Sequence, residues 1–234
     1  MCTGLPDELI EEIFKYISIK EILTKLCYVN KRWNKISNAS VLWRDVILNE
    51  WDITRLEEKH FEKIMRHSHG FVFFSLRHIK IEGPSVRITE TLEKNLAMAS
   101  KLVYLDLSWQ DVSSVDFLLN GNTQHNIETL ILDNCKNIEF KHLFNAILTL
   151  QNLSYLSLNN INLLAQDAVA IAKHTPLVFY LGISGIDLNM SDVNSILENT
   201  NRLIFLEMSS FDHNRESFTD LCNQYDVSVT FHQK

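Results

Sequence analysis

The chain has 234 residues, of which 46% are hydrophobic and 22% charged, an ordinary globular balance that argues against disorder beyond the chain ends. No apolar run approaches the length of a membrane span, and the N-terminus lacks a signal-peptide pattern, so we expect no membrane partner. The net charge is −7, and residues 71–234 carry the whole excess, with 11 basic against 18 acidic residues. Because a duplex-binding protein shows a basic face, we expect no nucleic-acid partner.

The four cysteines are widely separated and form no C-x-x-C pair. They indicate reduced thiols in an intracellular protein, so we expect the chain in the cytoplasm, the nucleus or both.

The first predicted helix begins at Pro6, with Asp7 and Glu8 favouring its positive end. Its apolar residues, from Leu9 to Ile17, cover an arc of roughly 160°, wider than one core-facing stripe needs. Ser18 and Glu21 form a capping box that begins a second helix. A third helical piece covers residues 30–36. The excess apolar surface either packs on the rest of the chain or belongs to a partner, and periodicity alone leaves both open.

The same residues resemble an F-box over about the first fifty positions. The resemblance is carried by an ordered set of short pieces: Leu5-Pro6-Asp7-Glu8-Leu9, Ile13-Phe14, Val29, Lys31-Arg32-Trp33 and Leu42-Trp43-Arg44. One departure is Asn30, where the family often has cysteine. The resemblance implies a three-helix module that docks on the adaptor subunit of an SCF-type ubiquitin ligase, and through it on the cullin scaffold.

In that family the Leu-Pro pair and apolar residues of the first helices fill adaptor grooves. The resemblance therefore implies the following adaptor-binding residues: Leu5, Pro6, Leu9, Ile10, Ile13, Phe14, Ile17, Leu23, Val29, Trp33 and Trp43.

Residues 52–70 read as a polar helical linker with a few apolar residues on one side. His67 and His69 are neighbours there, but two histidines without a cysteine or carboxylate cluster are more often solvated. We therefore expect neither a metal site nor a cofactor.

The remainder repeats an L-x-x-L-x-L pattern that indicates leucine-rich repeats. The middle positions of six units are Ile79, Leu105, Leu130, Leu156, Leu181 and Leu206, and the interval between them is nearly constant. Alternating apolar residues predict a short buried strand in each unit, and helical patterns such as residues 140–148 fill the other half. Stacked units predict a curved solenoid with parallel strands inside and helices outside.

The predicted fold class is thus α/β, with a three-helix F-box at 1–51, a helical linker at 52–70 and leucine-rich repeats at 71–234. The last range holds about six units and a terminal strand from Val227 to Phe231. The whole resembles the F-box/leucine-rich-repeat class of substrate receptors. A weaker resemblance, in the F-box and in the strand Leu105-Asp106-Leu107-Ser108-Trp109, is to the S-phase kinase-associated member of that class.

The residue before each middle leucine should point out of the concave sheet. Those residues are His78, Tyr104, Thr129, Tyr155, Tyr180 and Phe205, and four of the six are tyrosine or phenylalanine. An aromatic row there either stacks only on itself or binds a protein substrate. We expect the substrate-binding residues to be Tyr104, Asp106, Ile131, Tyr155, Tyr180, Phe205 and Glu207. The acidic residues expected on that face are Glu82, Asp106, Asp133 and Glu207, against Lys80 and His78.

Ser184 lies in a run that departs from a nucleophile elbow, because glycine follows the serine directly. We expect no enzyme. Three functions remain open: a non-catalytic substrate receptor, a non-ligase F-box scaffold, and a leucine-rich-repeat interaction or inhibitor protein.

Overall fold

The computed structural model of the chain describes residues 4–48, 55–77, 79–82, 85–119, 126–209 and 215–232. Its strands are β1 (Asp45–Ile47), β2 (Arg55–Glu57), β3 (Phe73–Ser75), β4 (Lys80–Glu82), β5 (Tyr104–Asp106), β6 (Thr129–Ile131), β7 (Tyr155–Ser157), β8 (Tyr180–Gly182), β9 (Phe205–Ser209) and β10 (Ser228–His232). Its α-helices are α1 (Asp7–Phe14), α2 (Ile19–Thr24), α3 (Lys31–Ser37), α4 (Glu58–Met65), α5 (Ser85–Leu96), α6 (Phe140–Thr149), α7 (Ala165–His174), α8 (Met190–Asn199) and α9 (Arg215–Gln224). Short 3-10 helices are η1 (Leu26–Tyr28), η2 (Ser40–Trp43), η3 (Ser68–Gly70) and η4 (Asp116–Leu118).

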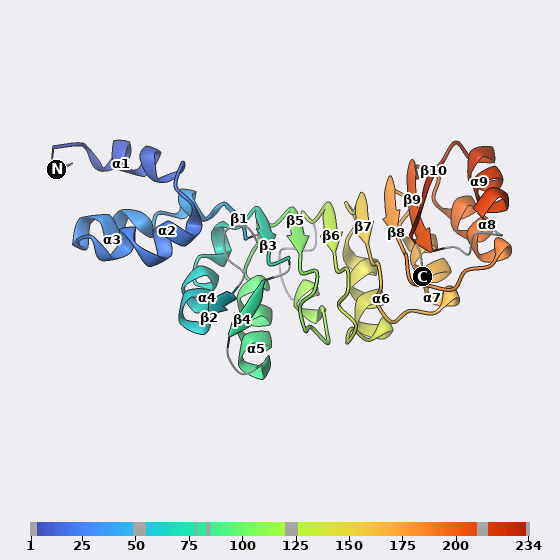
Figure 1. The fold of residues 1–234 in the computed structure, drawn as a ribbon, viewed down its shortest axis with the longest axis horizontal. Coiled ribbons are helices and arrows are strands. Elements are labelled where there is room, and N and C mark those ends of the chain that lie inside the picture. Colours follow the sequence, from blue (N-terminus) through green and yellow to red (C-terminus); the bar gives the residue numbers. More distant parts are fainter. Residues whose placement is uncertain are drawn as a thin grey trace.

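Three short helices form one end of the elongated molecule (Figure 1). Side-chain caps fix two of their starts, because Ser18 accepts a hydrogen bond from the amide of Glu21 at 3.3 Å and Asn30 accepts one from the amide of Trp33 at 2.8 Å. Pro6 begins α1 without a side-chain cap. Trp33 then packs edge-on against Phe14, with ring centroids 5.3 Å apart, and this contact joins α3 to α1.

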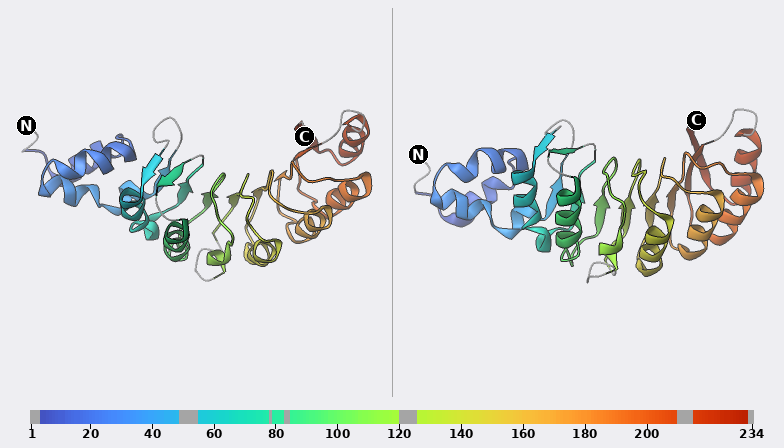
Figure 2. Two further views of the ribbon diagram at one scale, coloured as in Figure 1. Left: turned by 60° about the horizontal axis from the view of Figure 1, so that its bottom comes forward. Right: turned by 90° about the horizontal axis from the view of Figure 1, so that it is seen from below.

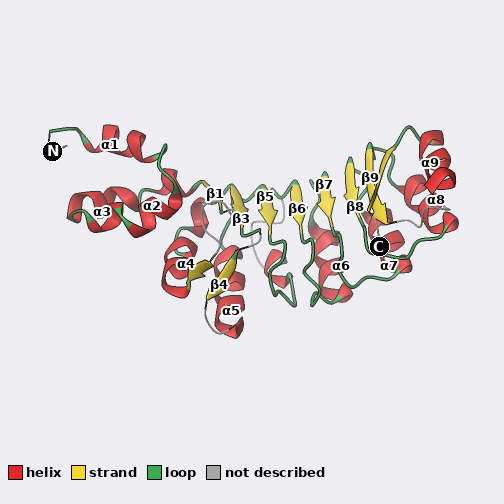
Figure 3. Cartoon of the chain, in the orientation of Figure 1, coloured by secondary structure: helices red, strands yellow, loops and turns green. Residues whose placement is uncertain are grey.

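The rest of the chain is the predicted solenoid. Eight parallel strands pair in the order β1-β3-β5-β6-β7-β8-β9-β10, and the middle leucine of each predicted unit from Leu105 to Leu206 is buried. Figure 2 shows the strands on the inner side of an arc and α5 to α8 on its outer side. Figure 3 shows the same alternation of strand and helix along the chain. The prediction of parallel strands inside and helices outside is confirmed.

The first predicted repeat is wrong. Ile79 and Ile81 do not enter the main sheet, because β4 pairs with β2 in a separate two-stranded sheet. The position in the main sheet that we expected for Ile79 and Ile81 is occupied by β3, and its Phe74 lies opposite Leu105 of β5. The core pattern there is Phe71-x-x-Phe74-x-Leu76, and all three side chains are fully buried. The step from Phe74 to Leu105 is therefore longer than the regular interval, and the extra residues hold β4 outside the stack.

The sheet also reaches into the range expected to be F-box alone. Strand β1 pairs with β3 in register, Val46 opposite Phe74, and Val46 is fully buried. The range expected to be a helical linker contains β2 as well as α4 and η3. Backbone pairing thus runs from the end of the N-terminal helices into the solenoid.

Trp43 and His67 stack at this junction, with ring centroids 4.3 Å apart and planes within 6°. The Trp43 ring is fully buried, and its indole N–H donates to the carbonyl of Ser37 at 2.9 Å. Burial, aided by the nearby His69, Lys63 and Arg66, lowers the pKa of His67 from 6.5 to about 4. His67 is therefore a neutral stacking partner at neutral pH.

We expect this stack to make the chain sensitive to mild acid. The folded state binds fewer protons at His67 than the unfolded state, so its stabilising contribution is complete above pH 6.5 and is lost as the pH falls towards 4. Because His67 is only partly buried, solvent screening limits the loss to about 1–2 kcal/mol. Urea unfolding of wild type and of His67→Gln between pH 7 and pH 4 measures it. The variant should be less stable at pH 7 and should lose less stability on acidification; equal losses in both proteins would contradict the assignment.

Candidate functional site

Helix α1 divides its wide apolar arc between two environments. Ile10 and Phe14 are buried against the neighbouring helices, whereas Leu9 is 50% exposed and Ile13 48% exposed. Tyr16, just beyond the helix, is 89% exposed. We call Leu9, Ile13 and Tyr16 the outer face of α1. This chain leaves it uncovered among its described residues, and large apolar side chains grouped in this way are typical of an interaction surface.

The predicted adaptor-binding residues therefore fall into separate groups. Pro6 and Val29 are exposed, as are Leu9 and Ile13, while Leu5, Ile17 and Trp33 are partly buried and pack against the core. For Ile10, Phe14, Leu23 and Trp43 we correct the prediction, because each is at most 2% exposed. These four belong to the core of this region, and they leave almost no surface for a partner to contact.

A contact that the sequence reading missed fixes the segment before α1. The guanidinium of Arg32 on α3 donates to the carbonyl of Leu5 and bonds the carboxylate of Asp7, the latter at 2.6 Å. Arg32 therefore orients the Leu5-Pro6 pair from the opposite helix. Its charge and its position in the Lys-Arg-Trp run were visible in the sequence, but its partners, two helices earlier in the chain, were not.

The second candidate surface is a row of aromatic residues across the inner face of the sheet. Strand pairing places Phe73, Tyr104, Thr129, Tyr155, Tyr180 and Phe205 side by side. His78, expected at the start of this row, lies outside the described residues, and Phe73 on β3 takes the position. We call the five aromatic members the aromatic column: Phe73, Tyr104, Tyr155, Tyr180 and Phe205.

Two contacts within the aromatic column are close. Tyr155 stacks on Tyr180 with ring centroids 4.1 Å apart and ring planes within 2°. The ring centroids of Phe73 and Tyr104 are 5.9 Å apart. Phe205 at the far end is 48% exposed. Burial raises the pKa of Tyr104 and of Tyr155 to about 12, aided by the carboxylate of Asp106 in the first case and of Glu207 in the second. Both phenols are therefore neutral across the physiological range.

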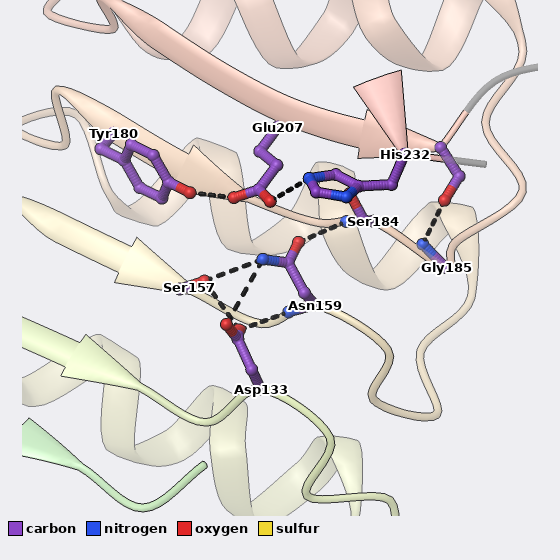
Figure 4. Close-up of polar contacts among 9 residues, drawn as sticks. Asp133, Ser157, Asn159, Tyr180, Ser184, Gly185, Glu207 and His232 are labelled. Atoms are coloured by element: carbon purple, nitrogen blue, oxygen red, sulfur yellow. Dashed lines mark hydrogen bonds and ion pairs between the residues drawn. The ribbon is translucent and has the colours of Figure 1, made fainter. Parts of the chain in front are cut away.

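Glu207 anchors the end of the column. Figure 4 shows the Tyr180 hydroxyl donating to its carboxylate, which also pairs with His232 on the neighbouring strand β10. The Glu207 side chain is 17% exposed. Glu207 thus holds the Tyr180 ring in place as well as lending negative charge to this end of the sheet.

Two predicted substrate-binding residues are covered, and we correct them. Asp106 is 1% exposed and accepts hydrogen bonds from the amide of Ser108 at 2.9 Å and from its hydroxyl at 2.6 Å. Ile131 is 7% exposed. Both face the inner side of the sheet, but neighbouring side chains leave them little surface for a partner.

A polar network at the ends of the strands was not predicted. Asp133 accepts hydrogen bonds from the Ser157 hydroxyl at 2.7 Å and from the amide of Asn159 at 2.9 Å, and the Asn159 side-chain oxygen accepts from the amide of Ser184 at 2.7 Å (Figure 4). Gly182 makes room for it, because a Cβ there would lie 2.7 Å from the Ser157 hydroxyl oxygen. The partners are one repeat apart, so aligning the repeats for polar residues would have revealed the ladder.

The charges of the inner face disfavour a phosphorylated ligand. The carboxylates of Asp133 and Glu207 act on Tyr155, and Arg77 is the single arginine that acts on Tyr104 and Tyr155. Lys80 and Glu82, expected on this face, belong to β4 in the separate sheet. Recognition of a phosphate normally needs an arginine cluster. Among the described residues no group of three or more His, Cys, Asp or Glu side chains could hold a metal ion, and no described helix has the length and apolarity to cross a membrane.

We therefore expect phosphorylation to give no gain in affinity for the aromatic column unaided. The measurement is a titration of the chain with paired phosphorylated and unphosphorylated peptides from any captured substrate. The phosphorylated member should bind no more tightly than its pair. Tight binding that phosphatase treatment abolishes would contradict this expectation.

Comparison with known proteins gives a family match for the N-terminal part. The F-box-like family matches residues 2–49, which include α1 to α3 and β1. Among curated proteins, the chain is 27% identical to the human (Homo sapiens) F-box/WD repeat-containing protein 12 over 104 residues, 43% of this chain and 22% of that protein. It is 24% identical to F-box protein DAS1 of Saccharomyces cerevisiae (strain ATCC 204508 / S288c) over 145 residues, 58% of this chain and 20% of that protein. The matches thus span about a fifth of the length of these relatives.

A solved structure with a similar course of the chain is the internalin InlF from Listeria monocytogenes str. 4b F2365. It is 13% identical, with a TM-score of 0.37, and the alignment covers 100% of this chain and 80% of that one.

Proposed function

We propose that this chain, whose residues 2–49 match the F-box-like family, is a substrate-recognition subunit of an SCF-type ubiquitin ligase. In this role the F-box docks on the adaptor subunit, and through it on the cullin scaffold, while the solenoid binds a protein substrate for ubiquitination. The contribution is not catalytic: the chain holds the substrate near a ligase bound elsewhere, and proximity raises the rate of transfer. We place this activity in the cytoplasm, the nucleus or both.

The observation that carries the proposal is the outer face of α1. Leu9, Ile13 and Tyr16 lie in the matched range and are between 48% and 89% exposed, while the buried half of the same helix already completes the core. A large apolar face that is not needed for folding is best explained by a docking partner. The Leu5-Pro6 pair, oriented by Arg32, lies just before this helix and is the second part of the proposed contact.

The aromatic column is the proposed substrate surface. Tyrosine supplies binding energy at low entropic cost, and the half-exposed Phe205 leaves apolar surface for a partner. Glu207 and Asp133 give the same face negative charge, so we propose a basic or apolar substrate segment.

The test is affinity purification of the tagged chain from cells with the proteasome blocked, followed by mass spectrometry. Wild type should capture an adaptor, a cullin and at least one protein whose ubiquitination falls when Leu9 and Ile13 are both changed to serine. Absence of adaptor and cullin from the wild-type sample would exclude an F-box role. Adaptor capture without any such dependent ubiquitination would indicate a non-ligase scaffold instead.

A further inference from the structure

The residues just before α1 are held by one side chain from α3. Arg32 lies in the first turn of α3, and its guanidinium reaches across to the start of α1. Its Nε donates to the Asp7 carboxylate at 2.6 Å, and its Nη2 donates to the carbonyl of Leu5. These two acceptors lie on either side of Pro6 in the chain, so one planar group bridges the proline.

The start of α1 depends on this restraint from outside the helix. Pro6 begins the helix without a side-chain cap, and it has no amide hydrogen to donate. The bonds of the helix reach back to the Pro6 carbonyl, which accepts from the amide of Ile10 at 3.2 Å. The Leu5 carbonyl lies one residue further out, where Arg32 supplies its donor. Arg32 therefore fixes the backbone at the point where helical bonding ends.

The ion pair between Arg32 and Asp7 contributes little to folding. The two side chains are 38% and 48% exposed, and ion pairs that are this accessible to water add little to stability. Core contacts already join the two helices, because Phe14 and Trp33 pack edge-on. The restraint on Leu5 and Pro6 is therefore not needed to hold α1 against α3.

The restrained segment leads directly into the proposed docking surface. Pro6 is exposed, and Leu9 on the outer face of α1 follows within the first turn and is 50% exposed. Leu5 is partly buried and packs against the core. A chain segment that a partner must order on binding lowers the affinity, because the ordering costs conformational entropy. A restraint that already orders the segment in the free chain removes this cost.

We propose that Arg32 is a positioning residue for adaptor docking, which holds Leu5 and Pro6 in the docking conformation before the adaptor arrives. Arginine suits this task because its rigid fork bonds two acceptors at once, whereas the ammonium of a lysine is a point charge on a flexible stem. The inference rests on the proposed function, since it takes the adaptor as the partner. It predicts that adaptor affinity depends on a side chain that does not itself touch the adaptor.

The test measures adaptor affinity and the order of Leu5 separately, in the full chain. Surface plasmon resonance with the immobilised adaptor gives the affinity, and nitrogen relaxation in NMR gives the mobility of the Leu5 amide in the free chain. Arg32→Ala should weaken adaptor binding at least about 10-fold and raise the mobility of Leu5. Arg32→Lys should lose most of the same affinity, because a lysine does not bridge both acceptors. Lys35→Ala is the matched control, an exposed cation one turn along the same helix, and should change neither.

Three results would overturn the proposal while wild type binds the adaptor. Loss of affinity with an unchanged Leu5 amide would mean that Arg32 contacts the adaptor itself. Unchanged affinity of Arg32→Ala, with or without greater mobility of Leu5, would mean that the restraint does not serve docking. Lower melting temperatures of both Arg32→Ala and Arg32→Lys would mean that the ion pair holds the helices together and has a purely structural role. If wild type itself does not bind the adaptor, the proposed function fails and this inference fails with it.

Discussion

Changing Leu9 and Ile13 to serine is expected to lower adaptor binding at least about 100-fold, with the helices still folded. Both side chains are about half exposed in the free chain, so their loss opens no cavity in the core. Each occupies the centre of the proposed docking face, where apolar anchors are typically worth about 2 kcal/mol or more, and two of them together suffice for this loss. Surface plasmon resonance with the immobilised adaptor measures it directly.

The matched control for this pair lies on the solenoid. Leu148 and Leu164 are 47% and 62% exposed, and replacing both with serine removes comparable apolar surface far from α1 in the sequence. Adaptor affinity of this control should equal that of wild type. If the Leu9 and Ile13 variant keeps its circular dichroism spectrum and binds the adaptor as well as wild type does, the outer face of α1 is not the docking surface.

Changing Tyr155 and Tyr180 to alanine is expected to weaken substrate capture by at least ~2 kcal/mol, which is about 30-fold. The two rings stack 4.1 Å apart at the centre of the aromatic column, and their removal also frees Glu207 from the Tyr180 hydroxyl. Adaptor binding should be unchanged, because both residues lie on the solenoid. The measurement is pull-down of the captured substrate at a series of concentrations.

Two controls separate recognition from loss of sheet stability. Phe140 and Phe144 form a comparable ring pair, 5.2 Å apart, on helix α6 at the outer side of the arc, and their change to alanine should leave substrate capture intact. Tyr180→Phe keeps the ring but removes its bond to Glu207. If the double tyrosine variant melts like wild type and retains its substrate, the stack has a purely structural role, and the substrate site lies elsewhere on the solenoid.

The repeating core was predictable because its physics is local. A buried strand of period two and a helix of period 3.6, repeated at a nearly constant interval, leave few alternatives to a stacked parallel sheet. The same regularity led to the wrong prediction for the first repeat. Ile79 and Ile81 matched both the pattern and the spacing, while Phe71 and Phe74 matched the pattern with an irregular spacing. Only the pairing of β3 with β5 decides between them.

The site was less predictable because exposure depends on neighbours distant in sequence. Periodicity showed that α1 is apolar over a wide arc, but the packing of Trp33 on Phe14 determines which half becomes surface. Asp106 lies on the inner side of the sheet as expected, yet the Ser108 hydroxyl and adjacent strands cover it.

Strand β1 has a mechanical consequence. It belongs to the matched F-box-like range and is also the first strand of the solenoid, so the two parts share one hydrogen-bonded sheet instead of a swivelling tether. The stack of Trp43 on His67 braces the same joint from the helical side. Under the proposed function, such a rigid joint fixes the distance and the orientation of the bound substrate relative to the adaptor. The substrate lysines that receive ubiquitin are then those that lie at the right distance from the adaptor. A longer flexible segment in the substrate would bring more of its lysines to that distance, whereas the receptor itself adds little freedom of movement.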